Sequence, residues 1–337
     1  MKRLLLLIAL SLVAYTTNAQ QNVNDLLAAG VQDAKQFTSD YIDPASDGLA
    51  YGINNGWFNS AEVGGQFKFQ LSVIANANFI KDEHKTFSLN VADYNNVRFP
   101  DGSPSINVAT ALGHNDPDIT VIVEYDDPIF GGSEVELILP TGIGAENINI
   151  IPTAFLQGSF NIFDGTALKA RFFPKVESED AEIGLYGVGI QQEFTKWLPA
   201  ESVFPVAISG LVSYTHLDAT YDFTDTSTID GENQKIDKDV RTFLGQLIVG
   251  TKLKVFNFYG GIGYLAGTSN SDFLGTYRVS DGFLFSEEIT DPFSIEKDIS
   301  GIRASVGANV KIGFFGINAD YTIAEFNSAS LGLNFSF

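Results

Sequence analysis

The chain after residue 61 alternates between apolar and polar residues with a period of two. The last strand-like segment sets four bulky residues against three small or polar ones: Leu331, Leu333, Phe335 and Phe337 against Gly332, Asn334 and Ser336. Because successive side chains of a strand point to opposite faces, this pattern predicts a sheet with one apolar and one polar face. Similar segments recur along the chain, and together they predict an all-β fold of about ten antiparallel strands.

The connections between these segments are short and long in turn. The short ones lie near Gly165, Asn257 and Phe314, and the longest covers residues 81–146. This asymmetry is typical of a transmembrane, up-and-down antiparallel β-barrel with short periplasmic turns and long extracellular loops. We therefore interpret residues 61–337 as such a barrel. The large loop 81–146 either folds separately or raises the strand number to about 12–14.

The printed sequence ends on an aromatic residue, Phe337. Termini of soluble proteins are usually frayed and wet, whereas the last strand of a barrel must pair with the first. The segment resembles the C-terminal recognition strand of Gram-negative outer-membrane β-barrels. That resemblance implies that Leu331, Leu333, Phe335 and Phe337 form an assembly signal, read by the barrel-assembly machinery.

The first 19 residues have the pattern of a secretory signal peptide. Met1-Lys2-Arg3 is positively charged, an apolar run follows, and small residues precede a cleavage position after Ala19. The apolar run is too short to span a bilayer as a helix. The chain has no cysteine, so a lipoprotein anchor and disulfide bonds are both excluded. We expect export through the inner membrane to the cell outer membrane.

Residues 20–60 differ from the rest of the chain. Asn24 can cap a helix from about Asp25 to Tyr41, and Pro44 is expected to end it. Two placements are open for this segment: a small periplasmic helix packed below the barrel, or a plug inside the lumen. The first placement is the one we favour from the sequence.

Charge and hydropathy agree with a membrane barrel. The net charge of −21 argues against nucleic-acid binding. No segment after the signal peptide has the roughly 18 consecutive apolar residues of a membrane helix. Seven basic residues lie on the polar, inward-facing parity of the strands: Lys68, Lys169, Arg171, Lys252, Lys254, Arg303 and Lys311. The sequence thus predicts a basic lumen beneath an acidic extracellular end.

Aromatic residues gather near the predicted strand ends rather than in the middle of most strands. This distribution predicts two aromatic girdles, one at each membrane interface, whose side chains contact outer-membrane lipid. The predicted girdle residues are Trp57, Trp197, Tyr186, Tyr214, Tyr264 and Tyr321.

No catalytic, cofactor or metal site is predicted. The three histidines are His84, His114 and His216, and only His216 has Ser213 and Asp218 nearby. His216 has the same parity as the outward-facing residues of its strand, and no other residue completes a catalytic triad with it. The acidic stretches 114–118 and 124–127 offer oxygen ligands for calcium but lack EF-hand spacing, so we interpret them as solvated loops.

The chain also resembles an uncharacterised Gram-negative outer-membrane family, a domain of unknown function. Gly56-Trp57-Phe58-Asn59-Ser60-Ala61 carries this resemblance, together with Pro152, Gln157-Gly158 and the segment Leu168–Phe172. It implies no catalytic residues. We expect a narrow transport or binding barrel for a small anionic or amphiphilic solute. The alternatives are a structural or surface-interaction barrel acting through acidic loops and, remotely, a hydrolase at the rim. Ligand and oligomeric state stay open.

Overall fold

The structure is a computed structural model that describes residues 27–127, 131–177, 180–198, 205–222, 231–253, 255–280 and 286–337. The predicted signal peptide, residues 20–26 and Lys254 lie outside these residues.

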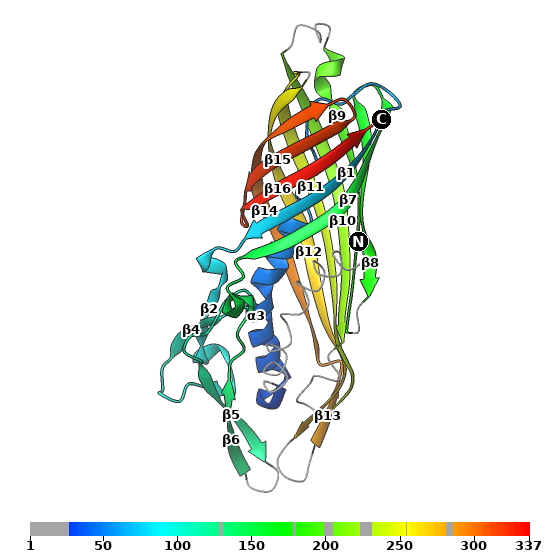
Figure 1. Ribbon diagram of the computed structural model, residues 1–337. Coiled ribbons are helices and arrows are strands. Elements are labelled where there is room, and N and C mark those ends of the chain that lie inside the picture. The colour runs from blue at the N-terminus through cyan, green and yellow to red at the C-terminus, as the bar shows by residue number, and fades with distance from the viewer. Residues whose placement is uncertain are drawn as a thin grey trace.

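Ten antiparallel strands close into one barrel (Figure 1). They are β1 (Phe69–Phe79), β7 (Ile150–Phe163), β8 (Thr166–Glu177), β9 (Ala181–Glu193), β10 (Val206–Asp222), β11 (Gly231–Thr251), β12 (Phe256–Ser280), β14 (Phe293–Ile312), β15 (Phe315–Ile323) and β16 (Ser328–Ser336). Each pairs with its neighbour in this order, and β16 returns to β1. A short strand, β13 (Ser286–Thr290), adds a hairpin beyond the end of β12. The predicted up-and-down barrel of about ten strands is confirmed.

Closure joins the last strand to the first. Leu333 lies opposite Val73, and Leu331 lies opposite Ala75. Beyond the paired strand, the Phe337 amide donates to the Phe69 carbonyl at 2.8 Å, and the Phe69 amide donates back at 3.2 Å. The sheet therefore has no open edge along the barrel wall, as a bilayer requires.

The outer face of the barrel is apolar. Large exposed side chains on it include Leu156, Val188 and Ile302. The predicted girdle residues Tyr186, Trp197, Tyr264 and Tyr321 are exposed as well, and Tyr214 is half-buried. An apolar exterior of this extent belongs to a barrel surrounded by lipid. Among the described residues, none of the helices has the length and hydropathy needed to cross a membrane.

The two ends of the barrel differ. Turns at Asp164-Gly165 and Gly313-Phe314 are tight, and the β9–β10 connection carries the 3-10 helix η5 (Phe194–Trp197). We call this the short-turn end, and Phe337 lies there. Toward the opposite, long-loop end the wall is uneven, because β10, β11, β12 and β14 have 17, 21, 25 and 20 residues, whereas β15 and β16 have 9 each.

Residues 81–146 fold separately at the long-loop end, and we call them the surface unit. Its elements are η2 (Asp82–His84), β2 (Thr86–Asn90), η3 (Val91–Asp93), β3 (Val97–Arg98), β4 (Ser105–Ala109), β5 (Thr120–Asp127), β6 (Gly131–Ile138) and η4 (Ile143–Glu146). Strands β2 and β4 form one sheet, and β3, β5 and β6 form another. Neither sheet joins the barrel, so the expanded barrel of 12–14 strands is wrong.

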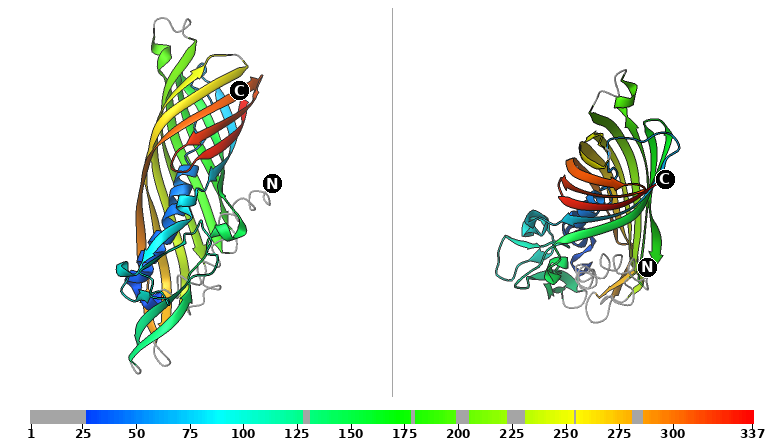
Figure 2. Two further views of the ribbon diagram at one scale, coloured as in Figure 1. Left: turned by 90° about the vertical axis from the view of Figure 1, so that its left-hand side faces the viewer. Right: turned by 45° about the horizontal axis from the view of Figure 1, so that its top comes forward.

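The N-terminal segment enters the barrel from the long-loop end. After η1 (Leu27–Ala29), helix α3 (Val31–Gly52) begins between the surface unit and the long strands, and its last turns lie inside the ring of strands (Figures 1 and 2). Pro44 does not end it, contrary to the sequence prediction. Proline removes one backbone donor, and packing on several sides of the helix outweighs that loss: Phe37 contacts Phe87 of the surface unit, and Tyr51 packs against Phe326.

The direction of this segment also differs from the favoured prediction. Phe37 and Tyr41 share a buried cluster with Phe273 and Phe293, which pair with each other at the long-loop end. The buried carboxylate of Asp33 accepts hydrogen bonds from the amides of Asn95 and Asn96 in the surface unit. The helix thus begins opposite Phe337 and runs toward the short-turn end, whereas a helix packed below the barrel would lie beside Phe337.

Candidate functional site

The lumen plug, residues 50–63, is the feature around which the barrel interior is arranged. Helix α3 ends at Gly52 inside the barrel, where its last carbonyl groups have no partner within the helix. These groups also form the negative end of the helix dipole. Thr153 of β7 donates to the Gly52 carbonyl at 3.2 Å. The amides of Asn54 and Asn55 donate to the Tyr51 and Gly52 carbonyls. Two arginines from the barrel wall bind the carbonyls of the turn that follows the helix, residues 53–55.

Arg171 of β8 is 1% exposed and reaches the plug from one side. Its guanidinium donates to the carbonyls of Ile53 at 2.5 Å and Asn55 at 3.1 Å. A third hydrogen bond, at 2.9 Å, goes to the side chain of Gln157. The group also lies 3.7 Å from the centre of the Trp57 ring, in cation–π contact. The planar fork of arginine suits this set of divergent acceptors.

Arg303 of β14 reaches the same turn from the other side. It donates to the Asn54 carbonyl at 3.2 Å and to the side-chain oxygen of Asn55. In the closed ring of ten strands, β8 and β14 are five positions apart, so the two arginines face each other across the barrel. We call Arg171 and Arg303 the arginine clamp. It holds the end of the helix between opposite walls.

The rest of the plug continues toward the short-turn end and is hydrogen-bonded to the barrel wall along the way. Lys169 donates to the Trp57 carbonyl at 2.8 Å, and Gln191 donates to the Ser60 carbonyl at 2.9 Å. At the exit, the amide of Val63 donates to the fully buried carboxylate of Glu193 at 2.8 Å. Glu193 also pairs with Lys252 at 3.2 Å. The segment is therefore anchored along its whole passage through the lumen.

The predicted basic residues separate into three groups. Lys169, Arg171 and Arg303 point inward as expected, but they bind carbonyl groups of the plug. Lys252 is partly buried against Glu193. Lys68 and Lys311 are exposed, and Lys254 lies outside the described residues. The innermost cations are thus occupied by the chain itself rather than open to a solute.

Trp57 is not a girdle residue, contrary to its sequence interpretation. It is fully buried in the lumen beneath Arg171. Its position ahead of the first strand resembled that of an interfacial tryptophan, because the sequence did not reveal that this segment passes through the barrel. Of the residues predicted to form an assembly signal, Leu331, Leu333 and Phe335 lie on β16 opposite β1, and Phe337 follows directly after β16.

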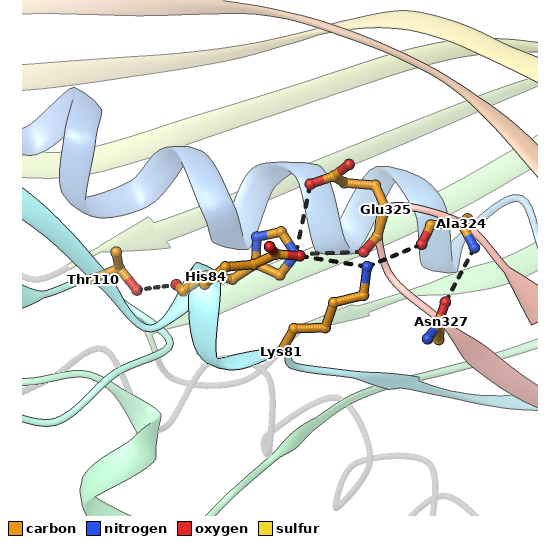
Figure 3. Close-up of polar contacts among 7 residues, drawn as sticks. Lys81, His84, Thr110, Ala324, Glu325 and Asn327 are labelled. Atoms are coloured by element: carbon orange, nitrogen blue, oxygen red, sulfur yellow. Dashed lines mark hydrogen bonds and ion pairs between the residues drawn. The ribbon is translucent and has the colours of Figure 1, made fainter.

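The histidines have different surroundings. The ring of His216 stacks on Tyr186 at 5.0 Å on the outer face, while Ser213 has the opposite parity on β10. His114 is exposed. His84 is buried and lies near Glu83 and Glu325 (Figure 3). Sequence reasoning missed this group because Glu325 lies in the β15–β16 turn, far from His84 along the chain.

The two stretches considered for calcium have structural roles where they are described. Asn115 is buried and accepts a hydrogen bond from the Ala109 amide at 2.7 Å. Glu124 pairs with Arg98 at 2.6 Å. These contacts favour the interpretation that the stretches are ordinary loop structure.

Acidic groups of α3 face lysines of the wall at the long-loop end. Asp43 pairs with Lys297 at 3.2 Å, and Lys238 donates to Ser46 at 2.5 Å. Burial raises the pKa of the Asp47 carboxyl to about 6. The Lys297 charge opposes this shift, whereas the carboxylates of Asp43 and Glu325 add to it. The carboxyl groups of Asp43, Asp47 and Glu325 therefore influence one another between the helix and the β15–β16 turn.

Comparisons with solved structures found barrels of Gram-negative outer membranes. The attachment invasion locus protein Ail of Yersinia pestis is 9% identical, with 81% of this chain and 99% of that chain covered and a TM-score of 0.28. The translocator domain of the autotransporter NalP from Neisseria meningitidis is 11% identical, with 90% of this chain and 98% of that chain covered and a TM-score of 0.29. The outer-membrane protease OmpT from Escherichia coli is 8% identical, with 82% of this chain and 100% of that chain covered and a TM-score of 0.31.

With TM-scores of this size, none of the three informs the function of this chain. A comparison with curated proteins found no match. The sequence matches a family description over residues 1–337. The chain belongs to DUF6588, a family of unknown function.

Proposed function

We propose that this protein is an outer-membrane barrel closed by its own N-terminal segment, and that it acts at the cell surface through the surface unit and the acidic long-loop end. The observation that carries this proposal is the occupation of Lys169, Arg171 and Arg303 by carbonyl groups of the plug. A signal peptide over residues 1–19 delivers the chain to the periplasm. The barrel-assembly machinery and outer-membrane lipid are its expected partners.

The energetics favour a closed resting state. A buried cation that loses its hydrogen-bond partners carries a large desolvation cost. Withdrawal of the plug would separate Arg171 and Arg303 from their carbonyl partners together, and the carbonyls of residues 53–55 would lose these donors. A solute would have to replace every one of these contacts. Conduction through the lumen is therefore not the activity that this geometry supports best.

The long-loop end, which we place outside the cell, carries charged side chains rather than an apolar surface. Its ion pairs join separate strands: Arg98 of β3 contacts both Glu124 and Glu134, and Arg278 contacts Glu232 and Glu288. In the stretch from Asp272 to Asp298 the sequence has seven acidic residues against two basic ones. We infer that this end binds cationic groups of other molecules, in a manner that weakens with salt.

Planar-bilayer conductance of the refolded protein tests the closed state. A Cβ on Gly250 of β11 would lie 3.2 Å from the Cβ of Ala61, slightly closer than in a relaxed disulfide. The double variant Ala61→Cys/Gly250→Cys therefore allows the plug to be locked to the wall in a chain without other cysteines. Wild type and the variant, oxidised or reduced, are expected to be silent. The single variant Ala61→Cys is the control.

A second candidate is gated transport of a small anionic or amphiphilic solute. It is favoured by polar atoms of the lumen that are buried without a hydrogen-bond partner among the described residues, including Ser213 Oγ, Trp57 Nε1 and Asn309 Oδ1. Such atoms line interiors that hold polar molecules. Stepwise conductance that disappears on oxidation of the double variant and returns on reduction would overturn the closed-barrel proposal and establish the gated one.

A further inference from the structure

We propose that Glu83, His84 and Glu325 form a binding site for a divalent cation of the zinc type at the long-loop end. The three residues come from two distant parts of the chain. Glu83 and His84 belong to η2, directly after β1, and Glu325 lies in the turn between β15 and β16. A bound cation would therefore join the start of the surface unit to the barrel wall.

The distances match a first coordination sphere that is slightly open. His84 Nε2 lies 3.9 Å from Glu83 Oε1 and 3.7 Å from Glu325 Oε1 (Figure 3). The three ligand atoms all lie within 4.8 Å of one another. Ligands bound to zinc at about 2.0–2.2 Å in a tetrahedral arrangement lie roughly 3.3–3.6 Å apart. The two distances from His84 exceed this range by a few tenths of an ångström, and the carboxylates reach it by turning toward the imidazole.

The imidazole is held in place before any cation binds. His84 is 8% exposed, and its ring lies parallel to that of Phe326 with 4.1 Å between centres. Thr110 donates to the His84 carbonyl at 2.6 Å and fixes the backbone. Phe326 is buried against Tyr51 of α3. These contacts hold the ring with Nε2 3.4 Å from the Glu325 carbonyl oxygen and close to both carboxylates.

The two glutamates leave room for further ligands. Their side chains are more than half exposed. One imidazole and two carboxylates make a three-ligand set with an open position for water, which suits zinc. Calcium is a poorer match because it binds oxygen ligands in greater number.

Charge around the site favours a cation. Glu83 and Glu325 place two carboxylates beside the imidazole, and both are more than half exposed. Lys81 approaches Glu83 Oε1 at 3.5 Å and also donates to the Ala324 carbonyl at 3.3 Å. It can keep the second contact when Glu83 turns toward the cation. Lys81 is thus a competitor that lowers affinity without blocking the site.

Zinc titration of the refolded protein, purified without a histidine tag, tests the proposal. Competition with a chromophoric chelator gives stoichiometry and affinity. We expect one zinc ion per chain. Glu325→Gln should weaken binding by at least about tenfold, since it removes a charged ligand at unchanged size. His84→Phe should do the same while it keeps the stacking on Phe326.

His114→Ala is the matched control, because His114 is an exposed histidine of the same surface unit that has aspartates nearby in sequence. It should bind zinc as wild type does. Heat-modifiable migration on gels confirms that each variant is folded. The proposal is overturned if wild type binds no zinc, or if Glu325→Gln and His84→Phe retain wild-type affinity. None of these outcomes depends on whether the barrel conducts.

Discussion

At the scale of single residues, Arg171 shows how a buried charge can organise a membrane barrel. Its guanidinium donates to three neutral acceptors and lies over Trp57. A charged hydrogen bond contributes about 1.5–3 kcal/mol, more than a neutral one. Against this stands the cost of removing the guanidinium from water. The balance favours the arginine, because without it the buried carbonyls of Ile53 and Asn55, in the turn after α3, would lose this donor.

Arg171→Met is therefore expected to lower the free energy of unfolding by about 2–4 kcal/mol, since the hydrogen bonds are lost while most of the packing volume remains. Urea unfolding in detergent micelles measures this. A Trp197→Phe background leaves Trp57 as the sole fluorescent tryptophan, because the chain has two. Lys68→Met, at an exposed lysine, serves as control and should change stability by less than about 0.5 kcal/mol. Equal free energies of unfolding for the two variants would refute the stabilising role of the arginine clamp.

At the scale of elements, the strands could be predicted from the sequence and the placement of the helix could not. Alternation is a local signal, and it assigned the inward parity of Lys169, Arg171 and Arg303 correctly. The course of α3 depends on contacts between distant residues, such as Asp33 with Asn95 and Arg171 with Ile53. The same residue types would serve a helix below the barrel, so nothing local separated the two placements. Glu325 joined His84 for the same long-range reason.

The direction of α3 predicts which face of the membrane its first half occupies. Long loops of outer-membrane barrels face outward, so Lys35, exposed on the first half of α3, should be accessible from outside the cell. Lys35→Cys should react with a membrane-impermeant maleimide on intact cells. Lys311→Cys, an exposed lysine at the short-turn end, should react only after lysis. Labelling of Lys311→Cys but not Lys35→Cys on intact cells would reverse the orientation, and the chain has no other cysteine.

At the scale of the whole molecule, closure depends on the pairing of β16 with β1. The reciprocal backbone hydrogen bonds of Phe337 and Phe69 extend this pairing beyond the end of β16. The two rings stack with 6.5 Å between centres. Because these bonds use the backbone, they survive a change of the Phe337 side chain, and the ring contact itself contributes only about 0.5–1.5 kcal/mol. A strong effect of this side chain in cells must then come from recognition during assembly.

Phe337→Ser is expected to deplete the protein from the outer membrane while the purified variant still refolds in detergent to a heat-modifiable barrel. Phe314→Ser is the matched control, because Phe314 is an exposed phenylalanine at the same end of the barrel but outside β16. It should reach the outer membrane at the wild-type level. Membrane fractionation and gel migration without boiling measure both properties. Depletion confined to Phe337→Ser assigns the terminal ring to the assembly signal, since the two variants lose the same side chain. Normal amounts of Phe337→Ser in the outer membrane would leave Leu331, Leu333 and Phe335 to carry that signal without it.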